Sequence, residues 1–129
     1  MEMIIDFPGG LQEDAHFRGH TIETDQMPAD SAPSPFEIFL SSIGTCAGIY
    51  VLGFCKQRNL STEGIRIIQR NHAAMNGMME KIDLEIQVPP TFPAQYYDAL
   101  VRSAELCKVK KTLENPPKFE VTTKVVEPA

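Results

Sequence analysis

The sequence lacks the short motifs that identify several common enzyme classes. Its 129 residues contain no Cys-x-x-Cys pair, no phosphate-binding P-loop, no Gly-x-Ser-x-Gly elbow and no glycine pattern for dinucleotides. These absences remove support for nucleotide-dependent enzymes and for serine hydrolases of the usual kind. No cofactor is indicated.

Positive charge is also scarce. Twelve Lys and Arg residues face seventeen Asp and Glu residues, which gives a net charge of -5. Binding to phosphate backbones or anionic lipid surfaces needs a basic surface. We therefore expect neither nucleic acid nor membrane as a partner.

No export signal is recognisable, since Met1–Asp6 is acidic and its apolar run is short. We expect a cytoplasmic protein, in which the three cysteines are thiols and not structural disulfides. An apolar share of 43% and a charged share of 22% are those of a globular protein, and 129 residues suit one domain, residues 1–129.

The longest uncharged run is Ile38–Cys55, 18 residues. Ser34 as N-cap, Pro35 at the first helical position and Glu37 three residues after the cap form a capping box, which predicts a helix over about 35–58. Such a run is also long enough to cross a membrane. We interpret it as a helix buried on all sides, because its glycines and hydroxyl residues lower its hydropathy and the amphipathic segments around it need a core.

The remaining elements follow from turn signals and periodicity. Asn76-Gly77 predicts a hairpin, and alternation in Ile82–Val88 predicts its return strand. The second helix should start near Pro93, with one apolar stripe that ends at Cys107. The full expectation is three strands (Met1–Asp6, Leu11–Phe17, His20–Thr24), the long helix, a hairpin (Ile65–Ala74 and Ile82–Val88), the second helix and a last strand (Phe119–Val125). The order βββ-α-ββ-α-β predicts an α+β fold with a mostly antiparallel sheet.

Cys46 and Cys107 are the candidate chemical pair. Cys46 lies in the middle of the long helix among small residues, and Cys107 ends an apolar stripe. Taken alone, each is more simply an inert core thiol than a redox thiol, but the two together favour redox chemistry. Lys108, Lys110 and Lys111 either supply positive electrostatic potential near Cys107 or, more simply, form a solvated basic turn. Cys55 is interpreted as packing.

Other titratable residues have simpler interpretations. Glu37 is either a general base or only the capping-box acid. His16 and His20 have a spacing that suits a metal pair on a helix, but they lie in a strand-like pattern, so no metal site is expected. His72 is expected at the surface.

Two segments resemble the OsmC-like superfamily, which includes the organic hydroperoxide resistance proteins. The first runs from Ser34 to Cys46, with a proline, an acidic residue and an aliphatic stretch before the cysteine. The second is Cys107–Leu113. The order of elements fits this family across nearly the whole chain.

The resemblance implies an intertwined α+β homodimer with a site at each subunit interface. It implies a thiol peroxidase in which Cys46 attacks the peroxide and Cys107 resolves the sulfenic acid as a disulfide. A dithiol reductant would regenerate the pair, and an apolar pocket would favour organic hydroperoxides.

The chain departs from the family pattern at one position. Alignment on the proline and Cys46 puts Phe36, and not Glu37, where the family has a catalytic glutamate. Arg18 is the candidate for the arginine with which the family holds its thiolate. The alternative is a non-catalytic protein of this fold that binds a small apolar ligand or acts as a thiol redox sensor.

Overall fold

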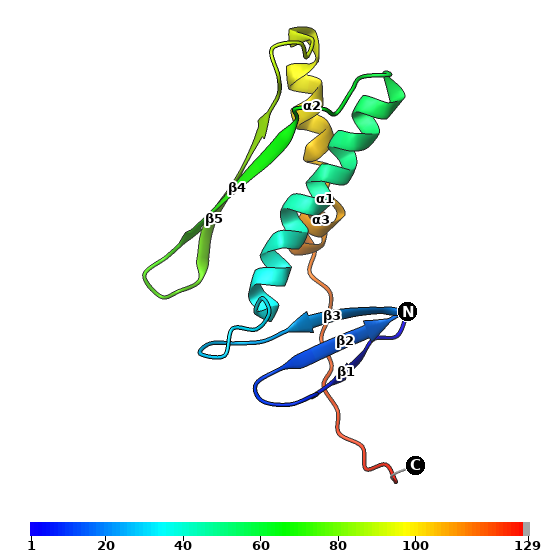
Figure 1. Ribbon diagram of the computed structural model, residues 1–129, viewed down its shortest axis with the longest axis vertical. Helices are drawn as coiled ribbons and strands as arrows, with labels where there is room; N and C mark the ends of the chain where they lie inside the picture. The colour runs from blue at the N-terminus through cyan, green and yellow to red at the C-terminus, as the bar shows by residue number, and fades with distance from the viewer. Residues whose placement is uncertain (128–129) are drawn as a thin grey trace.

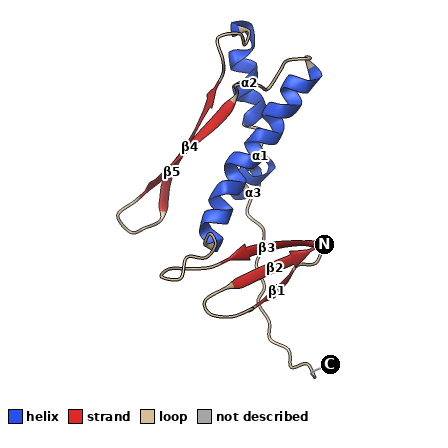
Figure 2. Cartoon of the chain, viewed as in Figure 1, coloured by secondary structure: helices blue, strands red, loops and turns tan. Residues whose placement is uncertain are grey.

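The computed structural model describes residues 1–127, so the last two residues of the expected domain lie outside it. A three-stranded antiparallel sheet has the order β1 (Ile4–Asp6), β2 (Glu13–Phe17), β3 (His20–Thr24). The long helix α1 (Pro35–Gln57) leads to the antiparallel hairpin of β4 (Arg66–Ala73) and β5 (Met79–Gln87). A 3-10 turn (Ala94–Tyr96), α2 (Tyr97–Ala104) and α3 (Lys108–Glu114) follow. The sheet lies at the start of α1, and the predicted α+β class is confirmed (Figures 1 and 2).

The two sharp turns of the strand regions follow from local chemistry. Arg18 and Gly19 join β2 to β3 with φ of 47° and 78°, the left-handed conformation that a two-residue hairpin needs. The hairpin predicted at Asn76-Gly77 is present, but only Gly77 (φ 83°) takes the left-handed conformation, within a loop of residues 74–78 between β4 and β5. The Arg18-Gly19 turn fixes the register of β2 with β3, whereas the β4–β5 pairing has a register shift at His72/Ala73 beside its loop.

The boundaries of α1 match the predicted capping. The Ser34 side chain accepts from the Glu37 backbone N–H, and Glu37 Oε1 accepts from the Ser34 N–H at 3.0 Å. At the other end Arg58 is the C-cap, and Asn59 takes the left-handed conformation with φ of 54°.

The burial of α1 differs from the prediction. One face is buried against α2, α3 and β4, but Ile49 is 66% exposed and Leu52 is 43% exposed. Burial on all sides is therefore wrong for a single chain, because one hairpin and two short helices cover only part of a 23-residue helix. Among residues 1–127, α1 is the one helix long and apolar enough to cross a membrane, a criterion that core helices of soluble proteins also meet.

The core lies between the second half of α1 and α2. It consists of Val51, Phe54, Cys55, Phe92 and Leu100. The β4–β5 hairpin lies along α1 (Figure 1), and Gln69 Nε2 of β4 donates to the Leu40 carbonyl of α1 at 2.9 Å. This bond fixes the hairpin against the first half of the helix.

Two expectations for the C-terminal third are wrong. The second helix ends at Ala104, so Cys107 does not lie on it but is the N-cap of α3. The predicted strand Phe119–Val125 has no strand pairing in the structure. A strand needs an edge to pair with, and this segment runs past the sheet and away from α1 without one (Figure 1).

The capping box gives a stability prediction. Ser34→Ala removes the acceptor for the Glu37 N–H and should lower the free energy of unfolding by about 1 kcal/mol, measured by urea denaturation. The matched control is Ser41→Ala on the same helix, whose hydroxyl bonds only the Ile38 carbonyl. Alanine is the better helix former there, so stability should not fall. Equal losses in both variants would contradict the assignment of the cap.

Candidate functional site

Cys107 is held at the point where α3 meets α1. Its thiol is 1% exposed and accepts the Lys110 backbone N–H at 3.5 Å, which makes it the N-cap of α3. Its Sγ also lies 3.9 Å from the Ile43 carbonyl oxygen of α1. These contacts position the sulfur one helical turn from Cys46.

Cys46 is half-buried and lies near Cys107. The two thiols are close enough for each to shift the pKa of the other, so residues 61 positions apart in the sequence are neighbours in the fold. Both are free cysteines. The structure therefore brings together the two thiols that the sequence singled out.

The surroundings of Cys46 favour its thiolate. Burial alone would raise the pKa of the Cys46 thiol. The Val109 N–H, the Cys107 thiol, the Lys108 N–H and the Lys108 ammonium together outweigh burial, so this pKa is lowered. A thiolate is the nucleophilic form of cysteine, and Cys46 is the better nucleophile of the pair.

The pKa of the Cys107 thiol shifts in the opposite direction. Burial raises it, the Lys110 N–H opposes this, and the nearby Cys46 raises it further. Cys107 therefore keeps its proton, and its thiol donates to the Ile43 carbonyl. One thiol is set to ionise and the other to stay neutral, an asymmetry of the kind that separates an attacking group from a resolving one.

An apolar pocket of about 400 Å³ lies beside Cys107. Residues of α1, β5, α2 and α3 line it, and the charged Glu105 and Lys110 also contribute. The lining includes Ile43, Ile82, Leu84, Val101, Leu113 and Cys107. A small apolar molecule fits a space of this size and character.

Glu37 lies at the start of α1 and is occupied by the capping box. Its hydrogen bonds with Ser34 lower the pKa of its carboxyl group. It precedes Cys46 by nine residues, about 13 Å along the helix axis, so the two side chains do not meet within one chain. Phe36 is half exposed and stacks on Phe39 at 5.7 Å between ring centroids.

Arg18 lies in the turn between β2 and β3. It is exposed, and its guanidinium lies 5.9 Å from the centre of the Phe17 ring. The groups that act on the Cys46 thiol come instead from residues 107–109. Within one chain the structure does not join Arg18 to the thiol pair.

Cys55 has the packing role expected for it. It is completely buried in the core beside Phe54 and Leu100, and burial raises the pKa of its thiol. It is therefore a poor nucleophile.

The sequence did not reveal that Lys108 and Val109 lower the pKa of the Cys46 thiol. Lys108 was considered only for its effect on its neighbour Cys107. The N-cap position of Cys107 turns the first N–H groups of α3 toward α1. A cysteine directly before a short lysine-rich helical segment is the signal that could have suggested this arrangement.

Comparison with known proteins identifies a family that matches most of the chain. A family model described as OsmC-like protein matches residues 28–122. No match was found among curated proteins.

Solved structures share the fold at low sequence identity. A putative osmotic stress induced and detoxification response protein from Psychrobacter arcticus is 18% identical with a TM-score of 0.71, over 85% of each chain. A hypothetical protein from Aquifex aeolicus is 17% identical with a TM-score of 0.65, over 89% of this chain and 87% of that one. An organic hydroperoxide resistance protein of Bacillus subtilis is 17% identical with a TM-score of 0.53, over 90% and 93%.

The electrostatics of Cys46 give a pH prediction. Alkylation by iodoacetamide, followed by peptide mass against pH, should modify Cys46 with a midpoint below the ordinary thiol value of about 8.5. Lys108→Gln removes a positive charge that favours the thiolate, so the midpoint should move to higher pH. Lys111→Gln, a change in the same helix, should leave it in place. A midpoint for Cys46 above that of a free thiol would contradict the assignment.

Proposed function

The chain belongs to the OsmC-like family, and from this premise we propose that it is a thiol peroxidase in which Cys46 reduces an organic hydroperoxide and Cys107 resolves the product. Among solved proteins of similar fold is one named for organic hydroperoxide resistance. The observation that carries the proposal is the proximity of two thiols whose pKa values are shifted in opposite directions.

The chemistry has two balanced steps. The Cys46 thiolate attacks the outer peroxide oxygen, the O–O bond breaks, and the alkoxide that leaves takes up a proton to become an alcohol. Cys46 is now a sulfenic acid. The Cys107 sulfur then attacks the Cys46 sulfur, a disulfide forms, and the sulfenic hydroxyl leaves with the thiol proton as water.

The proposed substrate class rests on the pocket, whose lining includes Cys107 but not Cys46. Its aliphatic walls stabilise the organic part of a hydroperoxide by removing apolar surface from water, a gain that hydrogen peroxide does not have. We therefore propose a preference for organic hydroperoxides.

The cycle also needs a reductant. Return of the disulfide to two thiols consumes two electrons, which a dithiol supplies through thiol–disulfide exchange. Because such reductants work in reducing compartments, the proposal includes a cytoplasmic location.

We further propose that the chain works as a homodimer. The exposed apolar residues of α1, such as Ile49 and Leu52, need cover. The segment that contains Phe119, Val121 and Val125 alternates like a strand and has no edge to pair with in its own chain. A second copy supplies both the cover and the edge.

The pocket favours a second candidate function. A 400 Å³ apolar space also suits a protein that only binds a small apolar ligand or that reacts once as a thiol sensor. Turnover separates the two functions, because an enzyme cycles with a dithiol and a binder or sensor does not.

Substitution of each cysteine tests the mechanism. With a dithiol present, reduced protein should consume cumene hydroperoxide repeatedly. Without the dithiol, one equivalent of the peroxide should remove two thiols, mapped by mass to a Cys46–Cys107 bond. Cys46→Ser should abolish consumption. Cys107→Ser should still form a sulfenic acid, trapped by dimedone, but should not form the disulfide.

Two controls accompany these variants. Cys55→Ala should keep its turnover, because this buried thiol takes no part in the cycle. Hydrogen peroxide should react more slowly than cumene hydroperoxide. An unchanged rate in Cys46→Ser would remove the proposed mechanism, and reaction of one equivalent without turnover would favour the sensor.

The dimer has a separate test. Sedimentation should give twice the chain mass at micromolar concentration, and Ile49→Asp should shift the protein toward the monomer by placing a charge on the exposed apolar face of α1. Glu63→Lys, a charge change in an exposed loop, should not. A monomeric wild-type protein would exclude this part of the proposal.

A further inference from the structure

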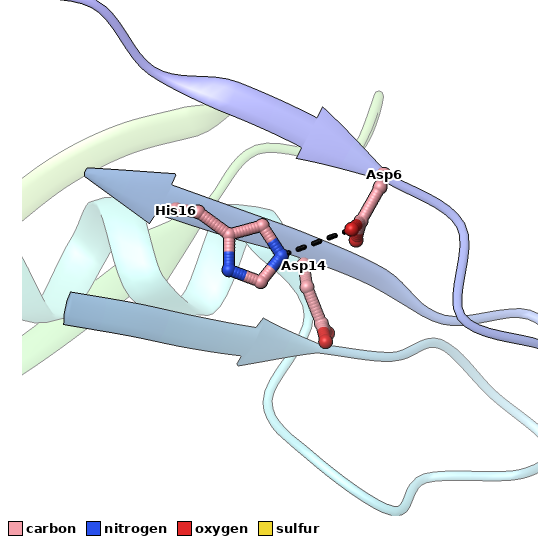
Figure 3. Close-up of side chains that lie close together, drawn as sticks. All are labelled: Asp6, Asp14 and His16. Atoms are coloured by element: carbon pink, nitrogen blue, oxygen red, sulfur yellow. Dashed lines mark hydrogen bonds and ion pairs between the residues drawn. The ribbon is translucent and has the colours of Figure 1, made fainter. Parts of the chain in front are cut away.

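The polar face of the N-terminal sheet gathers groups that the thiol chemistry does not use. In the register of β1 with β2, Asp6 pairs with Asp14. His16 lies two residues after Asp14 on β2 and therefore projects from the same face. Figure 3 shows the three side chains together, with the His16 ring directed at Asp6.

The three side chains offer ligand atoms at short range. One ligand atom from each lies within 4.8 Å of the others, and His16 Nε2 is 3.1 Å from Asp6 Oδ2. Two ligands of one metal ion at about 2.1 Å are at most about 4.2 Å apart. A small rotation of these solvent-accessible side chains closes that difference.

Thr21 orients the imidazole from the other side. Its Oγ1 lies 3.0 Å from His16 Nδ1, across the β2–β3 pairing. When the neutral ring donates Nδ1–H to Thr21, Nε2 presents a lone pair toward the Asp6 carboxylate. Without an ion the other tautomer lets Nε2–H donate to Asp6, and a bound cation takes the place of that proton. Metal-bound histidines are typically held in this way by a second hydrogen bond.

The charge of this region is unbalanced. The first 34 residues contain seven acidic residues and one Lys or Arg residue, Arg18, which lies over Phe17. Glu23 of β3 pairs with Asp14, so three carboxylates stand in one row across the sheet. Like charges placed opposite each other on neighbouring strands destabilise a sheet.

The other histidine–aspartate pair of the chain provides a comparison. His72 Nε2 lies 2.9 Å from Asp83 Oδ2 on the β4–β5 hairpin, and Lys81 Nζ lies 3.4 Å from the same carboxylate. There a lysine neutralises the aspartate. At His16 the position beside the pair is taken by a second aspartate, Asp14, which adds negative charge.

We propose that Asp6, Asp14 and His16 bind a divalent first-row transition-metal ion, such as Zn²⁺, with water in the open positions. An imidazole with two carboxylates suits such an ion better than Mg²⁺ or Ca²⁺, which prefer oxygen ligands. The ion joins β1 to β2 and offsets the carboxylate row. This site is separate from the thiol pair and does not depend on the proposed function.

Zn²⁺ titration tests the site. The untagged full chain carries Cys46→Ser and Cys107→Ser, so that the thiol pair cannot bind the metal, and is freed of metal with a chelator. Calorimetry should show one equivalent of Zn²⁺ per chain, and the ion should raise the unfolding temperature. His16→Asn and Asp14→Asn should each weaken binding at least tenfold and remove the thermal shift.

The matched control is His72→Asn, which breaks the histidine–aspartate pair that has its own lysine. It should leave Zn²⁺ affinity unchanged. The proposal is overturned if Zn²⁺ does not bind saturably, if Asp14→Asn binds like the parent, or if His72→Asn loses as much affinity as His16→Asn. Circular dichroism of each variant shows whether the fold is kept.

Discussion

The apolar surface of α1 is the constraint from which the rest of the structure follows. A 23-residue helix without charge over most of its length is stable in water only where other elements cover it. The β4–β5 hairpin, α2 and α3 all pack on it, and its second half forms the core with Leu100 of α2. The thiol pair results from the same packing, because Cys107 reaches Cys46 only when α3 docks on the helix.

Opposing electrostatic effects define the site. Burial disfavours the charged form of both thiols, and it prevails at Cys107. At Cys46 the N–H groups of Lys108 and Val109, with the Lys108 charge, prevail over burial. The same helix start that Cys107 caps therefore stabilises a thiolate on its neighbour. Because the first residues of the short helix α3 lower the pKa of Cys46, the pKa values of the two thiols shift in opposite directions.

The surface left uncovered by this chain has two different characters. Apolar side chains are exposed on the outer face of α1 and alternate with polar ones in the C-terminal segment around Val121, and the proposed dimer rests on them. The Asp6–Asp14–Glu23 row carries only negative charge, which favours a cation. The need to bury apolar surface and the need to neutralise negative charge therefore arise at different parts of the molecule.

The sequence by itself determined the features that depend on local chemistry. The start of α1 follows from Ser34, Pro35 and Glu37, and the hairpin follows from Asn76-Gly77, because caps and turns involve residues close in the chain. The sequence also singled out Cys46 and Cys107. Only the tertiary structure decided that they lie near enough to shift each other's pKa and that Cys107 caps α3. It also decided that the segment Phe119–Val125 stays unpaired, since a strand pattern does not say where its partner edge lies. The Asp6, Asp14 and His16 cluster was missed for the same reason: strand register, and not sequence spacing, brings it together.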